Sequence, residues 1–252
     1  MKKEWKNKKL FVFDLDKTLA ESKQPMDDEM ADLLRLFLQS VKIAVISGGS
    51  FAQYDRQFVP KLSEGNLDNL FLFPTCGSSF YRQENGEWRN VYTETLLDNE
   101  KKDIFAAFDS MFLDVGFSIP EVVYGELVED RGAQVTFSAF GATAPLSVKG
   151  GWDPDRKKRL KMIEVLKKYL PELEIRTGGT SSIDVTRKGI DKAYGIAQME
   201  KHIGISRKDM AFVGDDFEEG GNDHPIISTG VEYVHVKNPS QTKELLKSLM
   251  GL

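Results

Sequence analysis

The sequence predicts an α/β protein with a Rossmann-like three-layer core on a parallel sheet and an inserted α+β domain. Continuous apolar runs alternate with amphipathic helices near both ends of the chain, which is the rhythm of a parallel sheet covered by helices. Between residues 91 and 185 the rhythm changes, and alternation of apolar and polar residues indicates an antiparallel sheet. The first rhythm returns after Gly189. We therefore place the core at 1–87 and 187–252 and the inserted domain at 88–186.

The N-terminal elements follow from their apolar patterns. Leu10–Phe13 is a continuous apolar run, which is typical of a strand buried on both faces. Asp27–Gln39 is an amphipathic helix, because its apolar residues recur at i, i+3, i+4, i+7 and i+8. Ile43–Ile46 is a second buried strand that ends in Ser-Gly-Gly-Ser, before a helix that begins near Phe51. Leu70–Phe73 continues this rhythm, and the loop RQENGEW then marks a break.

The inserted domain is predicted to combine helices with an antiparallel sheet. Apolar and polar residues alternate along Ala133–Phe140, so this strand should have one covered face and one open face. The other predicted elements of the domain are a helix near Asp98–Leu113, a strand at Val122–Val128, a helix at about Asp155–Tyr169, and strands around Leu173–Arg176 and Ser182–Val185. The returning core contains a helix to His202, strands at Met210–Val213 and Val231–Val236, and a final helix from Pro239.

Composition limits the possible functions. Of the 252 residues, 40% are hydrophobic and 29% charged, as in ordinary globular proteins. The 34 basic and 39 acidic residues are mixed along the chain, so we expect no nucleic-acid partner. The single cysteine, Cys76, excludes an internal disulfide framework and a multi-cysteine zinc site. A single cysteine fits a reducing cytoplasm, which is the expected location. No stretch has the pattern of a signal peptide or a membrane span. The oligomeric state stays open, with a homodimer as one alternative.

Four separated segments carry the residue types of a catalytic site. Three of them lie directly after a predicted core strand, and the carboxyl ends of parallel strands meet at one edge of the sheet. We therefore expect their side chains to converge in the crevice there. The segments are Asp14-Leu-Asp16-Lys-Thr18, Ser47-Gly48-Gly49-Ser50, Lys188-Gly-Ile-Asp-Lys192 and Gly214-Asp215-Asp216-Phe-Glu-Glu-Gly-Gly-Asn222-Asp223.

Electrostatics then predicts a magnesium site. A carboxylate at ~4 Å from a phosphate dianion faces a repulsion of about 8 kcal/mol at an effective dielectric constant near 20. Mg²⁺ offsets this repulsion, with Asp14, Asp215 and the main-chain carbonyl of Asp16 as expected ligands. Lys192 would add an ammonium beside the nucleophile, and Ser47 a hydroxyl for a phosphate oxygen. Asp14 is the expected nucleophile, which forms an aspartyl phosphate, and Asp16 the expected general acid and base.

Other residues of these segments admit more than one role. Ser47 with its glycines also fits a simple turn that caps a helix, and Lys188 competes with Lys192. We expect Asp223 to orient the lysine or a metal-bound water, whereas Asp216 is a loop carboxylate or approaches the metal. Behind the metal ligands we expect Asp216, Asn222 and Asp223, and further substrate contacts from Thr18, Gly48 and Gly49.

The order DxDxT, Ser, Lys, GD…ND resembles the haloacid dehalogenase superfamily of phosphotransferases, and the place of the inserted domain is similar to the C2B-capped branch. The nearest likeness is to eukaryotic-type phosphomannomutases, whose fourth motif looks like GDDFEEGGND. EDRGAQVTFSAFG and RTGGTSSIDVTRKGIDKAYGI also resemble segments of that family. The resemblance implies substrate contacts at Lys23, Arg131, Lys149, Ser182 and Asp184.

Two departures from that family affect the expected activity. Ala142 stands where the mutases carry a phosphate-binding arginine, and Lys17 replaces the usual glycine of DxDGT. A mutase must hold both phosphates of its bisphosphorylated intermediate, so the loss of an arginine favours a phosphatase. We therefore expect a Mg²⁺-dependent phosphatase for a small phosphorylated metabolite such as a sugar phosphate, with an aspartyl-phosphate intermediate. The alternatives are a phosphomannomutase and, more remotely, a non-catalytic sugar-phosphate sensor.

Overall fold

The computed structural model describes residues 5, 7–22, 24–63, 65 and 67–252. The chain forms two compact units, Met1–Tyr92 with Asp191–Leu252, and Thr93–Ile190. The division lies a few residues beyond the boundaries expected from the sequence, at 87/88 and 186/187. The expected boundary at 87/88 falls at the start of β5, and the one at 186/187 falls at the end of β9. Because β5 belongs to the sheet of the first unit, the chain leaves that unit only near the end of this strand.

The first unit contains a seven-stranded sheet in the order β11-β10-β1-β2-β3-β4-β5. The five strands from β11 to β3 run parallel, and β4 pairs antiparallel with β3. The expected loop over RQENGEW is instead a hairpin turn at Asn85-Gly86, because both residues adopt the positive φ that such a turn needs. The strands are β1 (Leu10–Phe13), β2 (Lys42–Ile46), β3 (Leu70–Phe73), β4 (Ser79–Glu84), β5 (Glu87–Thr93), β10 (Met210–Gly214) and β11 (Glu232–His235).

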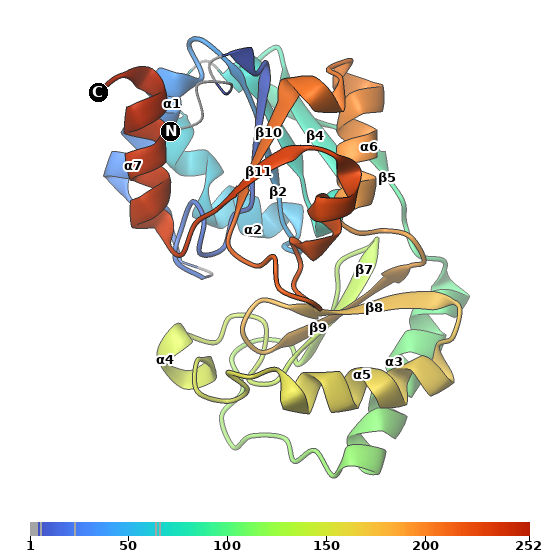
Figure 1. Ribbon diagram of the computed structural model, residues 1–252. Coiled ribbons are helices and arrows are strands. Elements are labelled where there is room, and N and C mark those ends of the chain that lie inside the picture. Colours follow the sequence, from blue (N-terminus) through green and yellow to red (C-terminus); the bar gives the residue numbers. More distant parts are fainter. Residues whose placement is uncertain (1–4, 6, 23, 64, 66) are drawn as a thin grey trace. The chain divides into compact units, whose positions relative to one another are not determined.

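Helices cover both faces of this sheet, which makes the unit a three-layer α/β fold. Phe11 and Phe13 of β1 pack in one core with α1, α2 and α7, whereas Leu10 and Val12 pack in a second core with α6. This division explains why β1 is apolar at every position. Figure 1 shows α1 beside α7, and these two helices contact each other. The helices are α1 (Asp28–Phe37), α2 (Phe51–Gln57), α6 (Lys192–Ile203) and α7 (Pro239–Met250).

The second unit is an antiparallel sheet in the order β6-β7-β9-β8, with α3 and α5 packed on its apolar face (Figure 1). The predicted strand Val122–Val128 was wrong over most of its length, because the chain turns at Gly125, where φ is 78°. All five residues of β7 are buried, so its polar face is not open as expected. The elements are α3 (Asp98–Val115), β6 (Val128–Asp130), β7 (Gln134–Ser138), α4 (Leu146–Lys149), α5 (Lys157–Tyr169), β8 (Leu173–Gly178) and β9 (Ser182–Arg187).

Across the described part of the chain, none of the helices combines the length and the apolar character that a bilayer crossing requires.

Candidate active site

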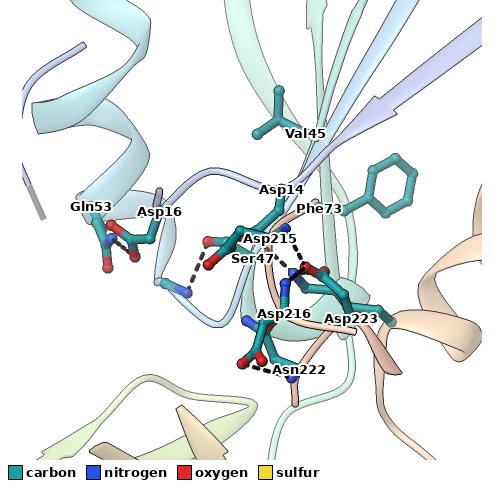
Figure 2. Close-up of polar contacts among 12 residues, drawn as sticks. Asp14, Asp16, Val45, Ser47, Gln53, Phe73, Asp215, Asp216, Asn222 and Asp223 are labelled. Carbon is teal, nitrogen blue, oxygen red and sulfur yellow. Dashed lines mark hydrogen bonds and ion pairs between the residues drawn. The ribbon is translucent and has the colours of Figure 1, made fainter. Parts of the chain in front are cut away.

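The candidate active site lies where three neighbouring parallel strands end. Phe13, the last residue of β1, is in register with Val45 of β2 on one side and Val213 of β10 on the other. Asp14 therefore emerges next to the ends of both strands, and its amide N–H donates to the carbonyl of Val213 (2.9 Å). Ser47 follows β2 directly in the same way. The convergence expected from the sequence is thus produced by the register of the sheet (Figure 2).

Three carboxylates and one lysine form the centre of the site. Asp14, Asp215 and Asp223 each offer an oxygen atom within 4.8 Å of the other two. Lys192 Nζ lies 2.6 Å from Asp14 Oδ1 and 2.6 Å from Asp223 Oδ1, and its side chain is fully buried. Lys192 is the first residue of α6, whereas the competing Lys188 is exposed. The geometry therefore favours Lys192 over Lys188 as the lysine of the site.

Asp223 fixes the positions of its neighbours through both carboxylate oxygens. While Oδ1 accepts from Lys192, Oδ2 accepts the amide N–H groups of Asp215 (3.0 Å) and Asp216 (2.9 Å). A Cβ at position 214 would lie 2.4 Å from Asp223 Oδ2, so glycine is required there. With its lone pairs engaged in this way, Asp223 is better suited to orient Lys192 and the loop of Asp215 than to bind a metal itself.

Burial and charge together determine the ionisation of the cluster. Burial raises the pKa of Asp14 well above its ordinary value, and the charge of Lys192 opposes that shift. Burial and the neighbouring Asp223 carboxylate raise the pKa of Asp215 to about 6. Burial alone would lower the pKa of Lys192, but Asp14 and Asp223 outweigh it and raise the pKa, so the ammonium keeps its charge.

This donor set fits a hard divalent cation. Three carboxylates against one ammonium leave two negative charges in a buried place. Mg²⁺ prefers oxygen ligands and is commonly held by one or two carboxylates with waters and substrate phosphates. Asp14 and Asp215 are the carboxylates that remain available for it. A bound cation would also stabilise the charged forms that burial disfavours.

The loop after β2 is shaped by Ser47. Its Oγ accepts the amide N–H of Gly49 (3.0 Å), and its carbonyl accepts the amide N–H of Cys76 (2.8 Å). Ser50, not Ser47, occupies the N-cap position of α2, and its side chain makes no capping hydrogen bond. Ser47 is therefore not a simple helix cap. Its buried hydroxyl, with Gly48 and Gly49 beside it, stays a candidate for contact with a phosphate oxygen.

The segment after Asp14 departs from a simple turn. The carboxylate of Asp16 is turned toward Gln53 of α2 (Figure 2), from which it accepts a hydrogen bond. It also accepts one from Gln57 of the same helix. Lys17 adopts a left-handed backbone conformation with φ 63°, and its charge lowers the pKa of Asp215. Thr18 is buried, and its hydroxyl has no hydrogen-bond partner among the described residues.

The remaining expected site residues divide between the two units. In the Asp215 loop, Asp216 Oδ2 accepts the amide N–H of Asn222 at 3.4 Å. Lys23 lies outside the described residues. In the second unit, Ser182 and Asp184 point to the polar face of the sheet, where Ser182 Oγ lies 2.9 Å from Ser138 Oγ and Asp184 Oδ1 accepts from Thr136 (2.8 Å).

Two expected cations of the second unit are not exposed surface groups. Arg131 makes two contacts of 2.7 Å with Glu129 Oε2, through Nε and through one terminal nitrogen. Lys149 ends α4 and is 2% exposed. Ala142 follows Gly141 in the turn after β7. Because Arg131 is already paired with Glu129, an anion bound at Arg131 would compete with Glu129 for the guanidinium.

Sequence reasoning missed several residues that shape the site. Gln53 and Gln57 are four residues apart on one face of α2, a spacing that could have identified them as partners of the loop before it. Arg159 forms a buried ion pair with Asp153 and donates to the carbonyls of Gly178 and Gly179, which fixes the turn before Ser182. No pattern in the sequence indicates that second interaction.

The fold and this site together define the class of the protein: it is a member of the haloacid dehalogenase superfamily, with an α/β core and an inserted unit, as the resemblance predicted. The family model of eukaryotic phosphomannomutase matches residues 30–252, and the chain belongs to that family.

Relatives support this placement along nearly the whole chain. A phosphomannomutase of Encephalitozoon cuniculi is 29% identical over 242 residues, which cover 93% of this chain and 91% of the relative. The phosphomannomutase of Saccharomyces cerevisiae is 27% identical over 250 residues, with 96% and 94% covered.

Solved structures with little sequence identity share the fold. A Plasmodium falciparum IMP-nucleotidase with bound IMP has a TM-score of 0.72 at 17% identity, over 98% of this chain and 69% of its own. The trehalose-6-phosphate phosphatase of Aspergillus fumigatus has a TM-score of 0.58 at 16% identity, over 99% of this chain and 96% of its own.

Proposed function

We propose that the protein is a Mg²⁺-dependent phosphomannomutase that interconverts mannose 1-phosphate and mannose 6-phosphate. The observation that carries this proposal is the family match over residues 30–252, together with the buried Asp14–Lys192–Asp223 contacts in the core. The expectation of a phosphatase rested on Ala142 and Lys17 alone. Relatives named phosphomannomutase that span more than nine-tenths of the chain favour the mutase.

Each residue of the site in the core has its own role in the proposed reaction. Asp14 attacks phosphorus and forms an aspartyl phosphate, while the bond from phosphorus to the sugar oxygen breaks. Asp16 gives a proton to that leaving oxygen and takes one back from the sugar hydroxyl that attacks next. Lys192 balances the charge of Asp14, and Ser47 donates to a phosphate oxygen. Mg²⁺ held by Asp14, Asp215 and the Asp16 carbonyl would neutralise the developing charge of the phosphoryl group.

The second unit is proposed to select the substrate. Ser182 and Asp184 provide a hydroxyl and a carboxylate on one face of β9, which suits the hydroxyl groups of a sugar. Arg131 and Lys149 provide positive charge for a phosphate. We further propose a cytoplasmic location, because a single cysteine in 252 residues suits a reducing compartment. A homodimer stays a prediction, which sedimentation equilibrium would check.

Phosphate-monoester hydrolysis is the second candidate, and Ala142 is the observation that favours it. Mannose 1-phosphate incubated with the protein, Mg²⁺ and a trace of hexose 1,6-bisphosphate separates the two candidates. We expect mannose 6-phosphate to appear faster than free phosphate, and neither product with Asp14→Asn. Release of free phosphate without the isomer would contradict the proposed function and establish the phosphatase.

A further inference from the structure

Two glutamines of α2 hold the side chain of Asp16, and the mechanism above gives them no task. Gln53 Nε2 donates to Asp16 Oδ2 (3.2 Å), and Gln57 Nε2 donates to Asp16 Oδ1 (3.4 Å). Each oxygen of the carboxylate thus receives one amide proton. Figure 2 shows Asp16 turned toward Gln53, apart from the cluster of Asp14 and Asp215. The general acid and base is therefore held on the side of α2.

Burial and further contacts fix the side-chain amides of Gln53 and Gln57 in place. Gln53 is 7% exposed and Gln57 is 3% exposed. Gln57 Nε2 also donates to the main-chain carbonyl of Gln24 (2.8 Å). A flipped amide would place its oxygen against two acceptors, so these contacts fix its orientation. A Cβ on Gly49 would lie 2.5 Å from Gln53 Oε1, which means that the glycine leaves the room that the Gln53 amide fills.

We propose that Gln53 and Gln57 form a latch that keeps Asp16 away from the aspartyl phosphate until a sugar phosphate is bound. This inference rests on the proposed function. A phosphoenzyme that must pass its phosphoryl group to a sugar loses it whenever water reacts first. The latch makes both glutamines positioning residues, because they act on the reaction only through Asp16.

The chemistry shows why the latch discriminates against water. In hydrolysis, a water oxygen bonds to phosphorus, the bond from phosphorus to Asp14 breaks, and Asp16 accepts the proton of the water. The products are inorganic phosphate and a free Asp14 carboxylate. Transfer to a sugar has the same balance, with a hydroxyl in place of water. A sugar phosphate brings binding energy that offsets two hydrogen bonds to Asp16, whereas water brings none.

The test compares the double variant Gln53→Met/Gln57→Met with the wild type. Methionine has a similar volume but donates no hydrogen bond. Gln39→Met is the matched control, because Gln39 is exposed and lies outside the site. Each protein is labelled with radioactive hexose 1,6-bisphosphate and Mg²⁺ and freed of excess label. Loss of label is then followed in buffer and, separately, with saturating mannose 6-phosphate.

The latch predicts faster hydrolysis without faster transfer. In buffer, the double variant should lose its label about tenfold faster, which corresponds to about 1.4 kcal/mol. Transfer to saturating mannose 6-phosphate should change by less than about twofold, since bound sugar has already released the latch. Gln53→Met alone, which keeps the tie between Gln57 and Gln24, should show a smaller acceleration in the same assay and replaces the double variant if that fails to fold.

Other outcomes overturn the inference in distinguishable ways. An unchanged rate of hydrolysis in a variant that is labelled normally removes the latch and leaves the proposed function intact. Hydrolysis and transfer that slow together would mean that the glutamines hold Asp16 in its working position. A wild-type protein that takes up no label contradicts the proposed function, and the latch with it.

Discussion

Replacing Asp223 with asparagine should damage stability and activity together. Asp223 accepts from Lys192 (2.6 Å) and from the amides of Asp215 (3.0 Å) and Asp216 (2.9 Å), with no exposed surface. Asparagine keeps the shape but has only one acceptor oxygen. If that oxygen faces the two amides, the new NH₂ group opposes the Lys192 ammonium; if it is flipped, it opposes both amides.

The magnitude follows from the contacts that are lost. The less damaging orientation loses one hydrogen bond to a buried charge, at about 1.5–3 kcal/mol, and adds a contact between two donors. Breaking a buried pair commonly costs about 3–5 kcal/mol, but Lys192 keeps Asp14 as a partner. We therefore expect the free energy of unfolding to fall by about 3 kcal/mol and kcat to fall by about 10²-fold, since 1.36 kcal/mol of barrier is tenfold in rate.

Urea unfolding followed by fluorescence and the mannose phosphate assay measure these two effects. Glu219→Gln is the matched control, because Glu219 is an exposed carboxylate of the same loop. It should leave stability within about 0.5 kcal/mol of the wild type. An Asp223→Asn protein with wild-type stability and activity would refute the positioning role that these hydrogen bonds assign to Asp223.

Two further predictions concern the metal site and the loop after Asp14. Burial raises the pKa of Asp215 to about 6, so protons compete with the cation for this carboxylate. Mg²⁺ affinity should therefore fall by about tenfold per pH unit as the pH drops below 6, and a flat profile in calorimetry from pH 5 to 8 would contradict this. Lys17 has a φ of 63°, a backbone conformation that is strained for a residue with a side chain, so Lys17→Gly should raise the free energy of unfolding by about 1 kcal/mol. Without the nearby ammonium, Mg²⁺ should also bind more tightly. A loss of stability in this variant would contradict the backbone strain at position 17.

The core of the fold could be predicted from the sequence because its signals are local. The apolar run Leu10–Phe13 implied a strand buried on both faces, and the structure divides its residues between two cores. Asp14 and Asp215 follow such strands directly, so the parallel register alone brings them together. Here local pattern and tertiary structure agree.

The interactions that were missed depend on contacts between distant residues. Thr136 was expected on an open face, yet it donates to Asp184, 48 residues away. Gln57 contacts Asp16 across 41 residues. Neither pairing follows from periodicity, which reports the face of an element and not what that face meets. The Asn85-Gly86 turn was different, because its dipeptide is a known hairpin signal that was instead interpreted as a break.

The most direct test of the account is a crystal structure of the protein grown with Mg²⁺ and beryllium fluoride, a mimic of the aspartyl phosphate. We predict a beryllium fluoride group on the Asp14 carboxylate and one Mg²⁺ ion that Asp14 and Asp215 share. Beryllium fluoride on another residue, or a Mg²⁺ ion bound away from both aspartates, would contradict the role of Asp14 as the phosphorylated nucleophile.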